Sequence, residues 1–203
     1  VRIWDIDPES LETGADAIAV IGQPDFNSTA PQEGAQGLQG PSFIAYDPEK
    51  QSLFVSDAKK RVMVFDVSAQ ALDTNLHKTA FAVIGQTDYD SNAPRPSMRK
   101  FSSGGPISLD YRYNRLFSGT FTENRVLVFD VSPEKLNGPS DPDAIAVLGQ
   151  PSYEETDPAV TQTRLTMTRI TVDTERQLAY VPDGYPAGNH INIFDIHPDR
   201  MQE

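Results

Sequence analysis

One short apolar segment that ends in aspartate occurs four times along the chain. It reads VRIWDID from residue 1, KRVMVFDVS from residue 60, NRVLVFDVS from residue 124 and HINIFDIH from residue 190. The shared aspartates stand 61, 64 and 65 residues apart, at Asp5, Asp66, Asp130 and Asp195. A chain that uses the same strand at a fixed period is built from repeated structural units.

Two further markers follow the same period. The first reads AIAVIGQPDF, AFAVIGQTDY and AIAVLGQPSY, and its glutamines, 63 and 64 residues apart, are Gln23, Gln86 and Gln150. The second is an aspartate that closes FIAYD, ISLD and ITVD, at Asp47, Asp110 and Asp173, with two intervals of 63 residues. Three markers in one order and with one period indicate a real repeat.

Each period predicts four short strands. In the second period they are Ser42–Asp47, Ser52–Asp57, Arg61–Val67 and Ala80–Gly85, rich in Val, Ile, Phe and Ala. The DPEKQ segment between the first two predicts a hairpin turn, in which Asp47 is able to bond its own backbone. The segments VMVF and VLVF have no polar position, which predicts strands covered on both faces. Four antiparallel strands per unit, stacked face to face, make a propeller blade.

We therefore predict an all-β chain, a β-propeller of four-stranded antiparallel blades. Residues 1–203 form a single domain, with repeat markers at residues 1–26, 42–89, 106–153 and 168–196. A sandwich does not repeat its sequence, and a β-solenoid has a shorter period. The polar segments between the third and fourth strands predict at most a single helical turn.

The composition of the chain argues against several classes of binding partner. The net charge of -12 argues against a nucleic acid and against an anionic membrane surface. No apolar run approaches the roughly 20 residues that span a bilayer. The chain has no cysteine, so it has neither disulfides nor thiolate chemistry. It opens on Val1 inside a strand-like run, so we expect any targeting segment to lie upstream.

The patterns GPxxIxxD, xLxVxD and NRVxVFD, followed by VIGQPDF at Val20 to Phe26, resemble NHL-repeat β-propellers of the long-period bacterial kind. The resemblance covers the whole chain. It implies six radial blades, of which this chain supplies about three, and an extracytoplasmic location. It also implies a scaffold that binds proteins or ligands, although related propellers include a peptide-amidating lyase and metal-dependent lactonases. The chain departs from the pattern in FSGTFTENRV, in VPDGYPAGNHINIF and in MTRITVD.

The repeated aspartates and the histidines give little indication of a metal site or a catalytic site. Four strand-end aspartates can be interpreted as cation ligands in a channel. A turn is needed once in every repeat, however, so the repetition favours turns that bond their own backbone. The histidines, at His77, His190 and His197, lack metal-binding spacing. We assign no catalytic residue, no metal ligand and no cofactor.

Six residues are candidates for binding. The densest basic segment, RPSMRKF, contains Arg95, Arg99 and Lys100, which suit an anionic ligand or acidic partner. The alternative is a loop that balances nearby carboxylates. Two irregular loops contain Phe121, Tyr185 and His190. Exposed aromatic residues suit a binding face, although they also suit packing over a neighbouring blade.

Two classes of function stay open. The first is a noncatalytic binding scaffold, because the loops vary between repeats while the strands do not. The second is a divalent-cation-dependent hydrolase or lyase with its site at the channel mouth. Three periods cannot close a ring, and an open end would expose a strand edge and a blade face. We therefore predict that the chain is part of a larger propeller or forms a homodimer that completes six blades. In that dimer VRIWDID and INIFDI compete for one position, so one of them is displaced or pairs elsewhere.

Overall fold

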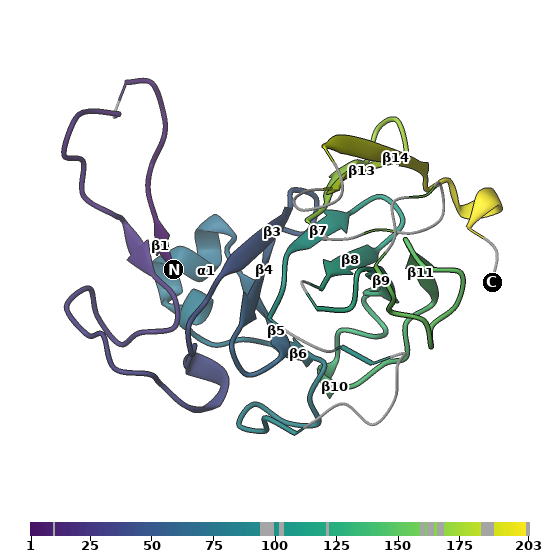
Figure 1. Ribbon diagram of the computed structural model, residues 1–203. Coiled ribbons are helices and arrows are strands. Elements are labelled where there is room, and N and C mark those ends of the chain that lie inside the picture. Colours follow the sequence, from purple (N-terminus) through teal and green to yellow (C-terminus); the bar gives the residue numbers. More distant parts are fainter. Residues whose placement is uncertain are drawn as a thin grey trace.

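The computed structural model describes residues 1–9, 11–93, 100–101, 104–120, 122–158, 161, 165, 169–183 and 189–201. These residues form an all-β protein with four sheets (Figure 1). The first sheet pairs β1 (Arg2–Ile3) with β2 (Ala19–Val20). The second contains β3 (Phe43–Asp47), β4 (Ser52–Asp57), β5 (Arg61–Asp66), β6 (Ala82–Ile84) and β10 (Gly138–Ser140).

The third sheet contains β7 (Ile107–Asp110), β8 (Arg115–Gly119), β9 (Val126–Asp130) and β11 (Ala146–Leu148). The fourth contains β12 (Thr171–Asp173), β13 (Leu178–Asp183) and β14 (His190–Asp195). Short helices connect some of these strands: α1 (Ala69–Thr74) and the 3-10 helices η1 (Gly34–Gln36), η2 (Leu76–Lys78) and η3 (Pro198–Arg200). The strands of the second period lie close to the predicted ranges, and its fourth strand, β6, is shorter than the predicted Ala80–Gly85.

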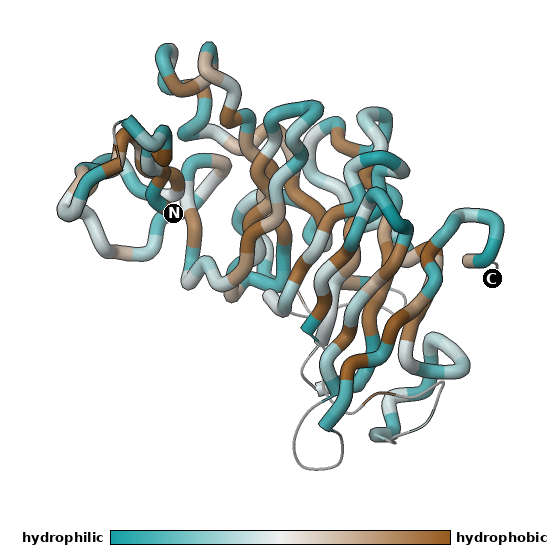
Figure 2. Tube along the Cα trace, turned by 90° about the horizontal axis from the view of Figure 1, so that it is seen from above, coloured by the Kyte–Doolittle hydropathy of each residue, from teal (hydrophilic) through white to brown (hydrophobic). Residues whose placement is uncertain are grey.

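The sheets stack face to face in chain order (Figure 2). A hydrophobic core fills each interval, between the first and second sheets, the second and third, and the third and fourth. The first strands of the last three sheets lie side by side, because β3 contacts β7 and β7 contacts β12. The first and fourth sheets lie at opposite ends of the stack, which does not close into a ring in the described residues.

Strand β5 shows how one strand contributes to two cores. Val62 and Val64 pack toward the third sheet, whereas Met63 and Phe65 pack toward the first. The side chains of all four residues are fully buried. Successive side chains in a strand point to opposite faces, so an apolar run without alternation is required here. The prediction of strands covered on both faces is confirmed.

The hairpin between β3 and β4 has the predicted chemistry. Asp47 Oδ1 accepts hydrogen bonds from the backbone N–H groups of Glu49 and Lys50, both at 3.0 Å. Gln51, the residue before β4, has a φ of 51°. Asn114 and Gln177, which stand 63 and 126 residues further along, have φ of 52° and 54°. The left-handed backbone conformation at this position is therefore part of the repeat. It favours asparagine and glycine, yet two of the three repeats have glutamine there.

The segment between third and fourth strands differs from repeat to repeat. In the second period it forms α1, which begins at Ser68, where the side chain accepts a hydrogen bond from Ala71 N–H at 3.2 Å. In the third period it forms β10, which pairs with β6 in parallel. The predicted helical turn is present in both cases, because in the third period Leu136 N–H donates to the carbonyl oxygen of Ser132 at 3.1 Å before β10 begins. The purely antiparallel sheet is corrected accordingly, because β10 adds a fifth, parallel strand.

None of the helices in the described residues is long and apolar enough to cross a bilayer.

Candidate functional site

The strand-end aspartates form turns. Each accepts a hydrogen bond from the backbone N–H two residues later. The N···O distances are 2.9 Å for Asp5, 2.9 Å for Asp66, 2.9 Å for Asp130 and 3.0 Å for Asp195. A carboxylate that bonds its own backbone in this way begins a turn. The interpretation of these aspartates as structural residues is confirmed.

The marker glutamines hold two loops together. Gln86 Nε2 donates to the carbonyl oxygens of Lys59 and Ala93, both at 3.3 Å. Gln150 Nε2 donates to the carbonyl oxygens of Asn124 and Asp157, both at 3.0 Å. In both repeats the glutamine therefore ties the loop after the fourth strand to the turn before the third strand. Its role is structural, because buried carbonyls need a donor.

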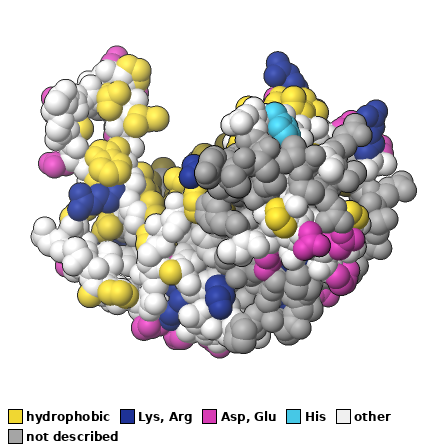
Figure 3. Space-filling model, in the orientation of Figure 1, with side chains coloured by type: hydrophobic (Ala, Val, Ile, Leu, Met, Phe, Trp, Pro, Cys, Tyr) yellow, Lys and Arg dark blue, Asp and Glu magenta, His cyan; other side chains and the backbone are white. Residues whose placement is uncertain are grey.

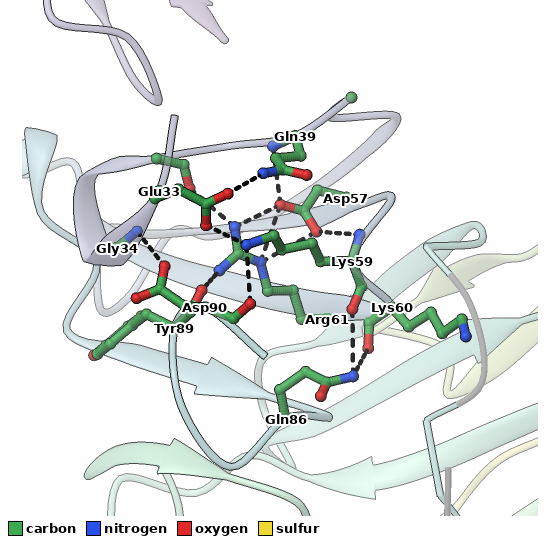
Figure 4. A network of polar contacts seen from close by, with 12 residues as sticks. Glu33, Gly34, Gln39, Asp57, Lys59, Lys60, Arg61, Gln86, Tyr89 and Asp90 are labelled. Atoms are coloured by element: carbon green, nitrogen blue, oxygen red, sulfur yellow. Dashed lines mark hydrogen bonds and ion pairs between the residues drawn. The ribbon is translucent and has the colours of Figure 1, made fainter. Parts of the chain in front are cut away.

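A buried arginine forms the centre of a polar network in the second repeat (Figure 4). Arg61 and Asp57 are both fully buried, and Arg61 Nε and Nη2 donate to Asp57 Oδ2 at 3.0 and 2.9 Å. The same guanidinium donates to the carbonyl oxygens of Gly37, at 3.1 Å, and Tyr89. The charge is thus paired and hydrogen-bonded within the chain, as a buried charge must be.

A second ion pair closes the network from outside (Figure 4). Lys59 Nζ contacts the carboxylate of Glu33 and donates to the carbonyl oxygen of Asp90 at 3.0 Å. Asp90 Oδ1 in turn accepts from Gly34 N–H at 2.6 Å. Three loops meet here, and the polar groups of each loop form hydrogen bonds or ion pairs with those of the others. The network therefore holds the three loops together.

The third repeat has an equivalent network between its loops, formed by different residues. Arg125, fully buried, donates to Glu123 Oε2 from Nε at 3.1 Å and from Nη2 at 2.8 Å, and it contacts the carbonyl oxygen of Tyr153. Thr120 stands where the second repeat has Asp57. Glu123, in the departing segment FSGTFTENRV, therefore supplies the carboxylate that Thr120 lacks.

The fourth sheet places histidine where the earlier repeats have arginine. His190 precedes the strand residue Ile191, and its Nε2 lies 3.7 Å from Asp183 Oδ2. Asp183 is 1% exposed, whereas the His190 side chain is 44% exposed. The sequence singled out His190 but not its carboxylate partner. Aligning Asp183 with Asp57 is the signal that finds it.

The predicted basic patch is seen in part. Lys100 Nζ lies 3.6 Å from Asp141 Oδ2 and 3.4 Å from Asp143 Oδ1, and it also contacts the carbonyl oxygen of Asp141. Its charge is balanced by acidic residues next to β10, and binding of an external anion stays a prediction. The other candidates lie outside the described residues: Arg95, Arg99, Phe121 and Tyr185.

The aspartate of the GQTD marker forms a turn with a lowered pKa. The hydrogen bond from the Ser91 hydroxyl, at 2.6 Å, lowers the pKa of Asp88 most, followed by the N–H groups of Asp90 and Ser91. A carboxylate with a lowered pKa adds stability above its unfolded value of about 3.9, and loses it as pH falls through the lower folded value. We expect Ser91→Ala to raise the Asp88 pKa, as followed by an NMR titration of the side-chain carboxyl carbon.

Asp25 provides the matched control. It occupies the same position one repeat earlier, and its pKa is lowered first by the backbone N–H of Asn27 and only second by the Ser28 hydroxyl. Ser28→Ala should therefore raise the Asp25 pKa by less than Ser91→Ala raises that of Asp88. Equal shifts, or none, would show that the hydroxyl does not set the difference.

The clearest functional feature is an apolar sheet face at the end of the stack. Ile191 and Ile193 of β14 are 62% and 61% exposed, whereas Val126 and Val128, at the same positions of β9, are both 0% exposed. Pro182 and Tyr180 pair with the two isoleucines across the sheet. We call these four residues the C-terminal end face: Ile191, Ile193, Tyr180 and Pro182. Exposed apolar patches of this kind mark interaction surfaces.

The opposite end exposes apolar residues for a related reason. Ile44 and Tyr46 of β3 are 57% and 49% exposed, whereas Ile107 and Leu109, at the same positions of β7, are buried against the second sheet. In the described residues the first sheet has two strands, and it does not cover β3. We call Ile44 and Tyr46 the N-terminal end face.

An arm that precedes β2 adds further exposed hydrophobic side chains. Figure 3 shows them gathered at the upper left of the view. The exposed residues of this arm are Trp4, Ile6, Leu11 and Ile18. An open stack of three periods predicts an exposed blade face, but the candidate binding residues named from the sequence lay in loops and included none of these apolar side chains.

Within the described part of the chain, no three His, Asp or Glu side chains are grouped so that they could hold a metal ion. Neither a protein-family model nor a curated protein matches the chain.

Proposed function

We propose that the chain is a noncatalytic interaction scaffold, an NHL-type β-propeller segment with about three of six blades. Three observations support this proposal: the three shared sequence markers, the face-to-face stack of sheets, and the first strands β3, β7 and β12 side by side. A propeller arranges its blades in this way around a central axis. The ligand-binding loops of such a scaffold are free to vary while the strands keep the fold.

The observation that carries the proposal is the exposure of Ile191 and Ile193. The equivalent residues of the two preceding repeats, Val62 and Val64 in β5 and Val126 and Val128 in β9, are buried by the following sheet. Burial of an isoleucine contributes about 1.5–3 kcal/mol. The C-terminal end face therefore favours a partner that presents another apolar β-sheet.

A second copy of this chain is the partner we propose. The N-terminal end face is exposed because the two-stranded first sheet does not cover β3, and the C-terminal end face is exposed because no sheet follows β14 in the described residues. The two ends are thus opposite halves of one type of sheet-to-sheet interface. Two copies joined at both interfaces supply six periods. Because β14 and β1 occupy the same repeat position, one of them is displaced or pairs elsewhere in that dimer.

Substitution of Ile193 tests this proposal. We expect the parent chain to dimerise in the micromolar range and Ile193→Asp to be monomeric, because a carboxylate on the end face cannot be buried against another sheet without cost. Multi-angle light scattering coupled to size exclusion gives the mass at each concentration. Thermal denaturation should give nearly the parent midpoint when both proteins are compared as monomers, because Ile193 is exposed in the single chain.

Ile145→Asp is the matched control. Ile145 is an apolar residue that is exposed at 43%, and its equivalents Ile18 and Phe81 are exposed as well. Its exposure therefore belongs to every repeat and not to the end of the stack, and we expect the dimer to persist. A parent chain that stays a well-behaved monomer throughout the micromolar range would overturn the proposal of a second copy.

A further inference from the structure

The outer edges of the second and third sheets differ, although their strands are equivalent. The edge of β6 is covered by β10, which pairs Gly138 with Ala82 and Ser140 with Ile84. The equivalent strand β11 is the last strand of its own sheet in the described residues. Ala82 and Ile84 are buried, whereas Ala146 and Leu148 of β11 are partly exposed. An uncovered strand edge presents backbone groups that can pair with another strand.

A groove runs along β11. It has a volume of about 430 Å³ and lies between β11, together with Tyr153, and the segment that contains Asp195, Arg200 and Met201. A space of this size falls within the range of ligand sites, which is about 300–1,000 Å³. The groove therefore has room for a short extended segment beside the strand.

The wall formed by residues 195–201 contains the same turn as the segments that lead to α1 and to β10. In the second repeat the carbonyl oxygen of Ser68 accepts from Leu72 N–H at 2.9 Å. In the third repeat the carbonyl oxygen of Ser132 accepts from Lys135 N–H at 2.8 Å and from Leu136 N–H at 3.1 Å. In the fourth sheet the carbonyl oxygen of His197 accepts from Arg200 N–H at 2.8 Å and from Met201 N–H at 3.2 Å.

Leu136 and Met201 also have equivalent surroundings. Leu136 packs on the core between the second and third sheets, and Met201 packs on the core between the third and fourth. Beyond Leu136 the third repeat continues directly into Gly138–Ser140 and onto the edge of β6. The groove beside β11 lies at the corresponding place beyond Met201.

We infer that the β11 edge is a binding site for an extended peptide segment that pairs in parallel, as β10 pairs with β6. The occupant has the chemistry of β10: small residues and proline, followed by acidic residues, as in NGPSDPD at residues 137–143. Backbone hydrogen bonds provide the binding energy, as in other cases where a peptide adds a strand to a sheet. The inference does not depend on whether a second copy covers the end face.

The test grafts the β10 segment onto the full chain. One variant carries Asn-Gly-Pro-Ser-Asp-Pro-Asp directly after Met201 in place of the last two residues, and the control carries a glycine-serine extension of equal length. Because the graft is tethered, its effective concentration at β11 is high. We expect the outward amides of Ala146–Leu148 to exchange hydrogen at least about tenfold more slowly in the graft than in the control. Equal exchange would overturn the inference.

A free peptide shows whether binding occurs in the groove or at another surface. The probe is the synthetic heptapeptide of residues 137–143, and its control is the same peptide with N-methyl groups on the backbone amides that would pair. Protection of β11 by the first peptide and not by the second supports strand pairing. Protection that appears on β14, or on β6 after displacement of β10, would place the binding elsewhere and overturn the assignment to β11.

Discussion

Val128→Asp should lower the free energy of unfolding by about 4 kcal/mol or more, a large part of the roughly 5–15 kcal/mol by which an ordinary domain is stable. Val128 is fully buried between the third and fourth sheets, where it packs with Phe117, Val181 and other apolar side chains. A carboxylate at this position would be buried without a partner. Urea denaturation followed by circular dichroism measures the loss.

The repeat supplies its own controls for this experiment. Val64→Asp should have a similar effect, because Val64 is fully buried between the second and third sheets. Ile193→Asp places the same carboxylate at the equivalent position of the fourth sheet, where the side chain is 61% exposed, and should cost the monomer little. If Val128→Asp unfolded at the same urea concentration as Ile193→Asp, the burial of both strand faces would be refuted.

The second large effect is expected at the buried ion pair. Asp57→Asn keeps the shape of the side chain but leaves the Arg61 guanidinium buried without its carboxylate. Removal of one member of a buried pair costs about 3–5 kcal/mol, because the remaining charge is uncompensated. The loops that meet at Arg61, which include Gly37 and Tyr89, should loosen together, since their carbonyl oxygens bond the same side chain.

An exposed pair with similar geometry calibrates this result. Arg112 Nη2 lies 2.8 Å from Glu175 Oε2, but both side chains are exposed, at 46% and 66%. Glu175→Gln should change the free energy of unfolding by only about 0–1 kcal/mol, because water screens the pair. Thermal and urea denaturation of the two variants side by side would settle the point: a loss in Asp57→Asn no larger than in Glu175→Gln would mean that the buried pair contributes no special stability.

Much of the fold could be predicted because the interactions that form its strands and turns lie within a single repeat. The continuous apolar run of β5 and the turn at Asp47 depend on neighbouring residues, so the sequence contains both. Strand β10 could not be predicted in the same way. Gly138, Pro139 and Ser140 have poor strand propensity, and they form a strand because β6 offers an edge to pair with. That edge belongs to another repeat.

The candidate site was harder to predict for a related reason. In the sequence, Ile191 and Ile193 look like the buried pair Val126 and Val128. Their exposure depends on the absence of a following sheet in the stack, which is a property of the assembly and not of the strand. Glu123 was missed because it stands two residues before Arg125, whereas Asp57 stands four residues before Arg61, so a comparison by position does not reveal their common role. Asp183 does align with Asp57, and only a comparison with the buried pair of the second repeat would have singled it out.

The pairing of β10 with β6 bears on how the stack comes apart. In an array whose units contact only their neighbours, opening can spread from the ends inward, one unit at a time. The third repeat, however, supplies a strand to the second sheet, and Ser140 accepts a hydrogen bond from Gly85 N–H at 2.9 Å. These two sheets are therefore cross-connected and open as one cooperative unit. The fourth sheet, whose β13 and β14 supply no strand to a neighbour, is free to fray first.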